Sequence, residues 1–525
     1  MTIACGNTDS HFNEAIRLRS DGLLAEAADV FRKALASCPD HLPSLVELGR
    51  TLYSQALMDD AIEQYNKALR LNSHDAVIHN NLGIVFQEQG RTDEAIAAFR
   101  KALELDPVFA IAHSNLLRCL NFHPALDNYH LFEAHKSFET MHGSLRRPQT
   151  VSYTNTGDPD RPLRIGYVSP DLGNHSVAYF VTAVFPNHDR SRFKVFCYSD
   201  RGKEDASSER IKKGVDVWRK IAGMEDDTLY SLIRSDAIDI LVDLAGHTGG
   251  NRLPLFARRA APVQVTWLGY PNTTGLSAMD YRIVDDVSDP PGEADRYHSE
   301  TLVRIPNGFL CFDPPAKAPS VSPLPMLKNG FVTFGSFNAL AKITDEAIEL
   351  WSQILSKVPG SRFLLKNKCL FDEATRNRMH DRFSAQGISR ERIMMTPFTM
   401  TTEEHLACYG HLDISLDTFP YNGTTTTCES LWMGVPVVGI LGDRHASRVT
   451  ASILARLGFD ALLANDVKEC VEIAVHLAQR PEFLNVMRFG LREKMRGSHL
   501  CDGMGFVGEL EREFRMCWLS MNNWS

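Results

Sequence analysis

The chain has 525 residues, a formal net charge of -9, 44% apolar residues and 23% charged residues. This length predicts several folding units rather than one core, and the composition excludes a largely disordered chain. The acidic balance argues against nucleic acid as the main partner, because a phosphate backbone is bound by a basic surface.

The cysteines and the apolar stretches predict a cytoplasmic protein. The 11 cysteines are scattered and form no pair of CxxC motifs, which is typical of reduced thiols. The first residues lack a basic region followed by an apolar run, so we expect no signal peptide. The longest apolar stretches, residues 238–244 and 435–441, fall far short of the roughly 20 residues of a membrane helix, so we expect no membrane partner.

An internal repeat occupies the first part of the chain. Three Ala-Leu pairs recur at intervals of 34 residues, at Ala34-Leu35, Ala68-Leu69 and Ala102-Leu103. Aromatic residues keep the same step, at Phe31, Tyr65 and Phe99. This spacing predicts tetratricopeptide repeats over residues 8–120, in which stacked helix pairs bury the aromatic stripe.

The repeats also contain positions that indicate turns and a binding surface. Gly22, Ala56 and Gly90 fall between paired helices, where we expect a small residue to permit close packing. We expect the arm to hold a protein or peptide. The polar residues Asn80, Asn81 and Asn115 either clamp a peptide backbone there or are simply solvated. Residues 121–160 are predicted as a helical connector followed by a polar linker over residues 144–161.

From residue 161 onward, strands alternate with helices, which predicts parallel sheets with crossovers. We expect strands near residues 163–169, 193–198, 238–244 and 263–267, and a second series at 331–334, 362–366, 393–395, 414–416 and 435–440. A proline-rich segment at 314–325 separates the two series. The sequence thus predicts two Rossmann-like lobes, residues 161–315 and 328–525, with ligands bound beyond the carboxyl ends of the strands.

The segment 417–432 is the most informative candidate site. It contains Asn422 and Gly423 in a turn, then Thr424, Thr425 and Thr426 at the start of a predicted helix. Free amides at a helix start, together with hydroxyls, favour a phosphate group. Four successive threonines exceed what one helix cap requires, so we prefer a phosphate site to a simple cap. Glu429, about one turn further on, is a candidate partner for a ribose.

Other candidates follow strands of both lobes. Lys342 precedes a predicted helix in the second lobe and is placed to offset charge on a leaving diphosphate. His175 and His247 follow strands of the first lobe, as expected for a general base or for residues that position an acceptor. The loop 268–275 contains Pro271, Thr273 and Thr274, which we expect to contact sugar or phosphate unless they only form a turn. His405 is a weaker candidate for stacking on a nucleobase.

The sequence predicts neither a metal site nor a cofactor. It contains no HExxH motif and no DxD motif with a partner carboxylate at a strand end. Asp285-Asp286 comes nearest, but no third ligand is evident. We therefore expect any diphosphate charge to be offset by Lys342 and by helix amides.

Several motifs together resemble the O-GlcNAc transferase / SPINDLY family. They are GNHSVAYF, DLAGHTGG, APVQVTWLGYPNTTG, FGSFNALAKIT and LDTFPYNGTTTTCESLWMGVPVV, following the repeats, and their wording is closest to the SPINDLY branch. The resemblance covers essentially the whole chain. It implies glycosyltransferase-B lobes and an inverting, metal-independent transfer of a sugar to Ser/Thr hydroxyls of intracellular proteins.

The resemblance also implies roles for individual residues. By position, Lys342 matches the family's diphosphate-binding lysine and His175 its active-site histidine. Thr425 and Thr426 match phosphate-binding threonines, Glu429 a ribose-binding carboxylate, and His405 a base-stacking histidine. The chain departs from the O-GlcNAc transferase pattern at four positions, namely Ala339, Thr402, Cys408 and Thr424. Because of these departures, both UDP-GlcNAc and GDP-fucose stay open as donors.

We therefore expect a protein O-glycosyltransferase whose repeat arm holds acceptor proteins, with a homo-oligomer as a possible assembly. Two alternatives stay open. One is a non-catalytic repeat scaffold that senses a nucleotide sugar, and the other is a transferase that acts on a small molecule or a polysaccharide. The presence of Lys342 and of the threonine loop favours the catalytic interpretation.

Overall fold

The computed structural model describes residues 6–143, 152–156, 158 and 160–522. Within it the chain forms two compact units, Met1–His123 with Gly335–Met400 and Pro124–Phe334 with Thr401–Ser525. Much of the predicted linker at 144–161 lies outside the described residues. None of the described helices is both long and apolar enough to cross a bilayer.

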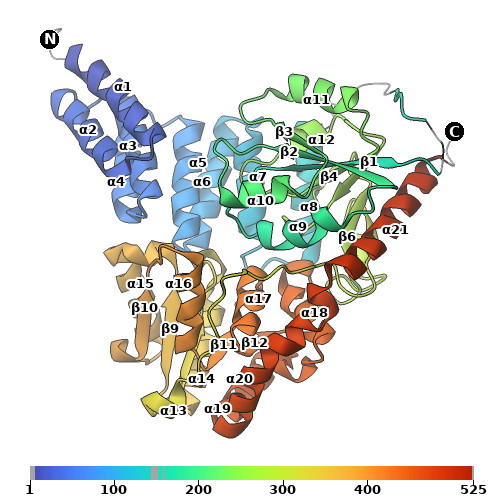
Figure 1. Ribbon diagram of the computed structural model, residues 1–525. Coiled ribbons are helices and arrows are strands. Elements are labelled where there is room, and N and C mark those ends of the chain that lie inside the picture. Colours follow the sequence, from blue (N-terminus) through green and yellow to red (C-terminus); the bar gives the residue numbers. More distant parts are fainter. Residues whose placement is uncertain (1–5, 144–151, 157, 159, 523–525) are drawn as a thin grey trace. The chain divides into compact units, whose positions relative to one another are not determined.

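The first unit begins with three antiparallel helix pairs (Figure 1). They are α1 (Gly6–Ser20) with α2 (Leu24–Ser37), α3 (Leu42–Ser54) with α4 (Met58–Leu71), and α5 (Ala76–Glu88) with α6 (Thr92–Leu105), followed by α7 (Ala110–Leu120). The aromatic residues Phe31, Tyr65 and Phe99 are at most 2% exposed, as predicted for a core stripe. A Cβ atom on Gly49 would lie 2.7 Å from the Tyr65 ring, so this glycine lets the paired helices approach closely.

The turn residues of the repeats are small mainly because of their backbone conformation, and the predicted close packing applies at Gly90, where a Cβ atom would lie 2.7 Å from the Leu340 carbonyl oxygen. Gly22, Ala56 and Gly90 have φ angles of 83°, 61° and 76°, in the left-handed region that few side chains tolerate. A Cβ atom on Gly22 would meet nothing within 4 Å, so backbone conformation rather than crowding selects glycine there. The 34-residue period therefore includes a left-handed turn between paired helices.

Part of the second α/β region completes the first unit. It contains η4 (Leu340–Lys342), α14 (Asp345–Lys357), β9 (Arg362–Lys366), α15 (Glu373–Ala385) and β10 (Ile393–Thr396). Repeat helices and α15 are joined by polar contacts, since Asp59 of α4 pairs with Arg378 at 2.9 Å. Gln89 donates to Thr375 Oγ1 at 3.1 Å. The repeats thus pack on an α/β segment instead of standing alone.

The second unit contains a seven-stranded parallel sheet with the strand order β3-β2-β1-β4-β5-β6-β7. Its strands are β1 (Leu163–Ser169), β2 (Phe193–Ser199), β3 (Val217–Lys220), β4 (Ile240–Asp243), β5 (Val263–Thr266), β6 (Tyr281–Val284) and β7 (Thr301–Arg304). Its helices are α8 (Asn128–Phe138), the π-helix η1 (Glu139–Gly143), α9 (Ala178–Val184), α10 (Ala206–Lys212), α11 (Asp226–Ser235) and α12 (Leu253–Phe256). The long C-terminal helix α21 (Gly503–Asn522) returns to this sheet, where Phe506 stacks on Trp267 with ring centroids 5.8 Å apart.

A second sheet has the order β10-β9-β8-β11-β12-β13. Its remaining strands are β8 (Thr333–Ser336), β11 (Ile414–Leu416), β12 (Val437–Ile440) and β13 (Leu463–Ala464). Helices α13 (Met326–Asn329), α16 (Thr402–Ala407), α17 (Thr425–Trp432), α18 (Val449–Arg456), α19 (Val467–Ala478) and α20 (Pro481–Arg496) complete the region. The predicted fold class, helical repeats followed by two Rossmann-like lobes, is confirmed.

Candidate functional site

The loop between β11 and α17 is folded around a buried carboxylate. Asp417 accepts hydrogen bonds from the Gly423 N–H at 3.2 and 3.3 Å and from the Thr450 hydroxyl at 2.5 Å. A Cβ atom on Gly423 would lie 2.5 Å from Thr427 Oγ1, so only glycine fits this turn. Asn422 is buried and donates its amide to the Thr418 carbonyl at 2.7 Å. Asn422 and Gly423 therefore shape the loop.

The four threonines of this loop fall into two groups. Thr427 is buried, and its hydroxyl lies 2.9 Å from that of Thr450. Thr424, Thr425 and Thr426 are half-buried at the start of α17. The first N–H groups of a helix have no acceptor within it, and the helix dipole favours negative charge there. The three threonines and the helix start therefore form an arrangement suited to a phosphate group.

Glu429, one turn into α17, is paired with a histidine. Its Oε2 lies 2.9 Å from His405 Nε2 and accepts from the Tyr409 hydroxyl at 3.2 Å. The His405 and Tyr409 rings meet edge to face at 5.8 Å. Burial raises the pKa of Tyr409 well above its usual value, so its hydroxyl stays a donor. His405 itself keeps one quarter of its side chain exposed.

A cavity of about 230 Å³ lies at the end of β1. His175 lines it together with Asn174, Tyr179, Thr182, Arg210 and Thr402. The Val177 N–H donates to His175 Nδ1 at 3.3 Å, so the neutral ring carries its proton on Nε2, which lies 3.7 Å from Asp171 Oδ1. Burial lowers the pKa of His175, although the charge of Asp171 opposes this shift. The neutral imidazole therefore carries its N–H group on the side of Asp171.

This cavity adjoins the Glu429–His405 pair. Thr402, at the start of α16, lines the cavity, and His405 lies one turn further along the same helix. Burial raises the pKa of Tyr179, and the charge of Glu429 adds to this effect. His175 and Thr402 thus line one cavity, and the Glu429–His405 pair lies next to it in the second unit.

His247 lies elsewhere, in an aromatic cluster, and is fully buried. Its Nε2 is 2.9 Å from the Thr274 carbonyl, and its ring meets Phe138 edge to face at 4.7 Å. The turn before it is held by Asp243, which accepts from the Gly246 N–H at 2.9 Å. A side chain enclosed in this way does not reach a substrate, which favours a packing role over the predicted catalytic one.

The loop 268–275 is also turned inward. Thr273 and Thr274 are fully buried, and both hydroxyls donate to the carboxylate of Glu300, that of Thr273 at 2.6 Å. The Thr274 N–H donates to Glu300 at 2.7 Å. Pro271 is half-buried beside them. The predicted donor contacts of Thr273 and Thr274 are therefore replaced here by an internal anion.

Lys342 belongs to the first unit. Lys342 is the last residue of η4, between β8 and α14, and is half-buried. Its backbone N–H donates to the Ala339 carbonyl at 3.0 Å. Thr344 caps α14 by accepting from the Ala347 N–H at 3.2 Å. The Arg382 guanidinium donates to the Ile343 carbonyl at 2.9 Å. The short segment that carries Lys342 is therefore fixed on both sides.

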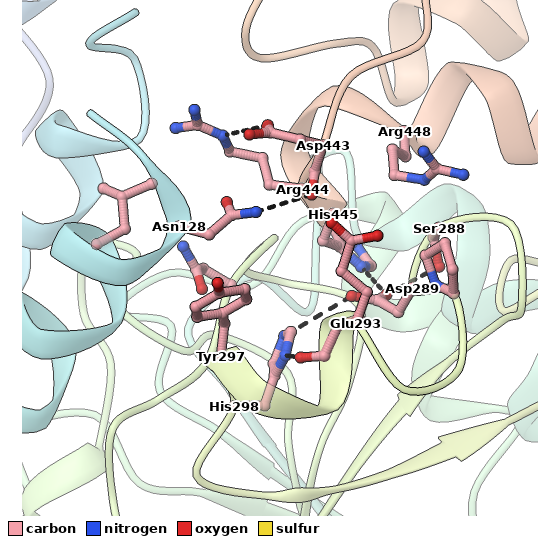
Figure 2. A pocket seen from close by; sticks show the side chains of 14 residues that line it. Asn128, Ser288, Asp289, Glu293, Tyr297, His298, Asp443, Arg444, His445 and Arg448 are labelled. Carbon is pink, nitrogen blue, oxygen red and sulfur yellow. Dashed lines mark hydrogen bonds and ion pairs between the residues drawn. The ribbon is translucent and has the colours of Figure 1, made fainter. Parts of the chain in front are cut away.

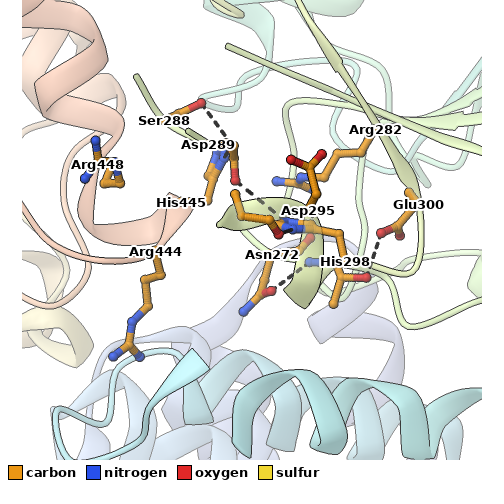
Figure 3. A network of polar contacts seen from close by, with 12 residues as sticks. Asn272, Arg282, Ser288, Asp289, Asp295, His298, Glu300, Arg444, His445 and Arg448 are labelled. Carbon is orange, nitrogen blue, oxygen red and sulfur yellow. Dashed lines mark hydrogen bonds and ion pairs between the residues drawn. The ribbon is translucent and has the colours of Figure 1, made fainter. Parts of the chain in front are cut away.

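The second unit also contains a buried polar network that the sequence did not predict. Figure 2 shows His298 and Glu293 on one side of a small pocket and Arg444, His445 and Arg448 on the other. In Figure 3, Asp289 lies between the two histidines, 2.5 Å from His445 Nδ1 and 3.7 Å from His298 Nε2. Burial opposes ionisation of Asp289, but His445 holds its pKa well below the usual range.

This network contacts the loop between β11 and α17. The Asn422 N–H donates to the carbonyl of Ala446, the residue after His445, at 2.7 Å. His445 follows β12, whose position was predicted, so the rule that ligand-binding loops lie at strand carboxyl ends could have drawn attention to it. Asp289 and His298 carry no such signal, because they lie in a long connection after β6.

Among the residues that line the site, Tyr179, Thr402 and Tyr409 were not predicted as functional. Tyr179 and Tyr409 lie on helical segments and look like core aromatics in the sequence. Thr402 was noted only as a departure from a family pattern. Their proximity to Glu429 results from pairing between distant segments, which periodicity does not reveal.

Comparison with known proteins adds to this geometry. The sequence profile of glycosyl transferase family 41 matches residues 136–319 and 324–510, and a tetratricopeptide profile matches residues 40–107. A probable UDP-N-acetylglucosamine–peptide N-acetylglucosaminyltransferase SPINDLY of Solanum lycopersicum is 47% identical over 393 residues, 74% of this chain and 42% of the relative. The corresponding enzyme named SEC in Arabidopsis thaliana is 33% identical over 68% of this chain and 37% of its own length.

A solved structure matches along the whole chain. A mutant of the Thermobaculum terrenum O-GlcNAc transferase has a TM-score of 0.94 and 34% identity, and the match covers 100% of this chain and 99% of that one. The chain spans less than half the length of the curated relatives named above. The profile match covers well over half of the sequence, and the chain belongs to glycosyl transferase family 41.

Proposed function

We propose that this protein transfers a single sugar from a nucleotide sugar to Ser/Thr hydroxyls of other proteins. The observation that carries the proposal is the half-open threonine group at the start of α17, beside the Glu429–His405 pair, in a chain of family 41. The names of its relatives, peptide N-acetylglucosaminyltransferase and O-GlcNAc transferase, support the same class of reaction.

Each part of the site has a role in this proposal. The amides and hydroxyls of Thr424, Thr425 and Thr426 hold the diphosphate, Glu429 binds the ribose, and His405 stacks on the base. The acceptor hydroxyl oxygen bonds to the anomeric carbon while the bond from that carbon to the diphosphate oxygen breaks, with inversion, and the nucleoside diphosphate and the hydroxyl proton are released. Lys342 offsets the charge that develops on the leaving group. The Nε2 proton of His175 orients an oxygen of the substrate.

The donor is either UDP-GlcNAc or GDP-fucose. Ala339, Thr402, Cys408 and Thr424 depart from the O-GlcNAc transferase pattern, and Thr402 borders the His175 cavity. Identity to SPINDLY sequences is higher than to SEC, at 47% against 33%.

We further propose that transfer needs no metal or cofactor, that the repeats hold the acceptor proteins, and that the enzyme works in the cytoplasm. Ten cysteines in the described chain are free thiols, which suits a reducing compartment.

Transfer with two labelled donors tests the proposal. The full chain is incubated with radiolabelled UDP-GlcNAc or GDP-fucose and a mixture of cytosolic proteins. Label on protein supports the proposal, label only on small molecules indicates the alternative transferase, and no turnover indicates a sensing scaffold. We expect Lys342→Ala to lower the rate by about 100-fold or more without unfolding the chain, since it removes a charge used mainly in the transition state. Near-normal turnover of Lys342→Ala contradicts its assigned role.

A further inference from the structure

The repeat helices enclose a polar cavity that the transfer site does not use. It has a volume of about 250 Å³ and lies among α1, α3, α4 and α5 of the first unit. Its lining includes the cations Arg19 and Arg50, the hydroxyls of Tyr53 and Ser54, and Asn81. We call this space the repeat cavity.

The asparagines predicted for this surface do not act alike. Asn80 and Asn115 are each only 4% exposed, and Asn115 donates its amide to the Asn80 side chain at 2.9 Å. They therefore tie α5 to α7 in the core. Asn81 alone of the three lines the repeat cavity. Its Nδ2 is buried and makes no hydrogen bond within the described chain.

The repeat cavity has an excess of cationic donors. Arg19 and Arg50 share one carboxylate, that of Glu47, at 3.0 Å each. The Nε atom of Arg19 is buried without a hydrogen-bond partner among the described residues. Two guanidiniums on one carboxylate leave both positive charge and donor capacity.

Positive charge continues beyond Tyr53. Lys368 Nζ lies 5.7 Å from the Tyr53 ring and 3.1 Å from the Glu88 carboxylate. The charge of Arg118 also favours ionisation of the Tyr53 hydroxyl. Burial, with help from Glu88, raises the pKa of Tyr53 to about 12, so its hydroxyl remains a donor. Arg19 and Arg50 thus line the repeat cavity and Lys368 lies beside Tyr53, in a chain whose net charge is -9.

From this arrangement we propose that the repeat cavity binds carboxylate side chains of an acidic segment in the partner protein. A guanidinium matches a carboxylate in two parallel hydrogen bonds, and Asn81 and Tyr53 supply further donors. That the partner is a sugar acceptor rests on the proposed function. The binding itself does not, because no donor or transfer step is involved.

Fluorescence anisotropy with the full chain and no nucleotide sugar tests this site. The probe is a fluorescein-labelled Gly/Ser peptide that carries a run of glutamates, compared with peptides that carry glutamine, lysine or phosphoserine instead. We expect the glutamate peptide to bind at least about tenfold more tightly than the glutamine peptide, and salt to weaken its binding.

Charge reversal separates recognition from misfolding. We expect Arg50→Glu to weaken the affinity for the glutamate peptide by about tenfold or more and to raise the affinity for the lysine peptide. An unfolded arm would not gain affinity for the lysine peptide. The matched control is Arg32→Glu on α2, whose side chain is 52% exposed and does not line the cavity.

The proposal is overturned if glutamate and glutamine peptides bind equally, if only the phosphoserine peptide binds, or if Arg32→Glu has the same effect as Arg50→Glu. If the glutamate peptide binds but the separate assay with both labelled donors shows no sugar transfer to protein, the proposed function is overturned and the carboxylate site stands.

Discussion

Two loops of the second unit have the same ingredients but opposite environments. Residues 268–275 and residues 417–427 each follow a buried parallel strand and contain glycine and several threonines. In the first loop, Thr273 and Thr274 close on the carboxylate of Glu300 and are fully buried. In the second, Thr424 to Thr426 stay half-exposed at a helix start.

The two loops differ in which groups bind the carboxylate that lies beside them. Glu300, from a distant part of the chain, provides the first loop with an internal carboxylate. In the second loop the internal carboxylate, Asp417, accepts from the Gly423 N–H and the Thr450 hydroxyl. The same contrast separates His247, enclosed by aromatic rings, from His175, which is 45% exposed at its cavity. Buried carboxylates thus bind the hydroxyls of Thr273 and Thr274 in the first loop, but the Gly423 N–H and the Thr450 hydroxyl in the second.

The largest expected effect is on Glu300. Glu300→Gln places an amide donor against three donors of the 268–275 loop, and we expect it to lower the free energy of unfolding by about 3 kcal/mol. Urea denaturation followed by tryptophan fluorescence measures this loss. The control is Glu472→Gln, since Glu472 is exposed on α19 and should change stability very little. Equal stability of the two variants would contradict the structural role of Glu300.

A smaller stability effect should follow from one threonine of the inward loop. Thr274→Val removes a hydroxyl from Glu300 and leaves its N–H bond in place, so we expect a loss of about 2 kcal/mol. Thr425→Val in the open loop should leave the unfolding curve unchanged within about 0.5 kcal/mol. A reversed order of these two variants would show that the loops have been assigned the wrong roles.

The next effect is on the affinity of the α17 site for the nucleotide part of the donor. His405→Ala removes the ring proposed to stack on the nucleobase, and we expect donor binding to weaken about tenfold. Direct titration with UDP and GDP measures the change. His499→Ala, at another exposed histidine, serves as control. Unaltered affinity of the His405 variant would place the base elsewhere.

The smallest effect concerns pH. Burial lowers the pKa of His175, so the ring stays neutral to below its usual 6.5. Protonation then places a proton on Nδ1, which can no longer accept from the Val177 N–H that fixes the ring, so kcat/KM should fall as pH drops through that lowered value. Asp171→Asn removes the charge that favours the protonated ring, so the acid limb of the pH profile should move lower still, by less than about one unit. A shift of the limb toward higher pH would show that this pair does not control the activity.

The fold was largely readable in the sequence, while the environment of individual residues was not. Strands β1, β9 and β11 occupy the predicted residues, because their apolar patterns are local. The four-residue strands β6 and β7 were missed, since each includes an arginine and has little alternation of apolar and polar residues. The burial of His247 depends on Phe138 and Tyr270, and that of Thr274 on Glu300, which only the folded chain brings together.

The central claim is that the α17 threonines bind the phosphate groups of a nucleotide, whereas the threonines of the 268–275 loop do not. Isothermal titration of UDP and GDP into the native chain, Thr425→Val and Thr274→Val tests it most directly. We predict that Thr425→Val weakens nucleotide binding about tenfold. Thr274→Val should keep the native affinity below its unfolding temperature. Native affinity in Thr425→Val, with binding lost in the folded Thr274→Val variant, would contradict the claim.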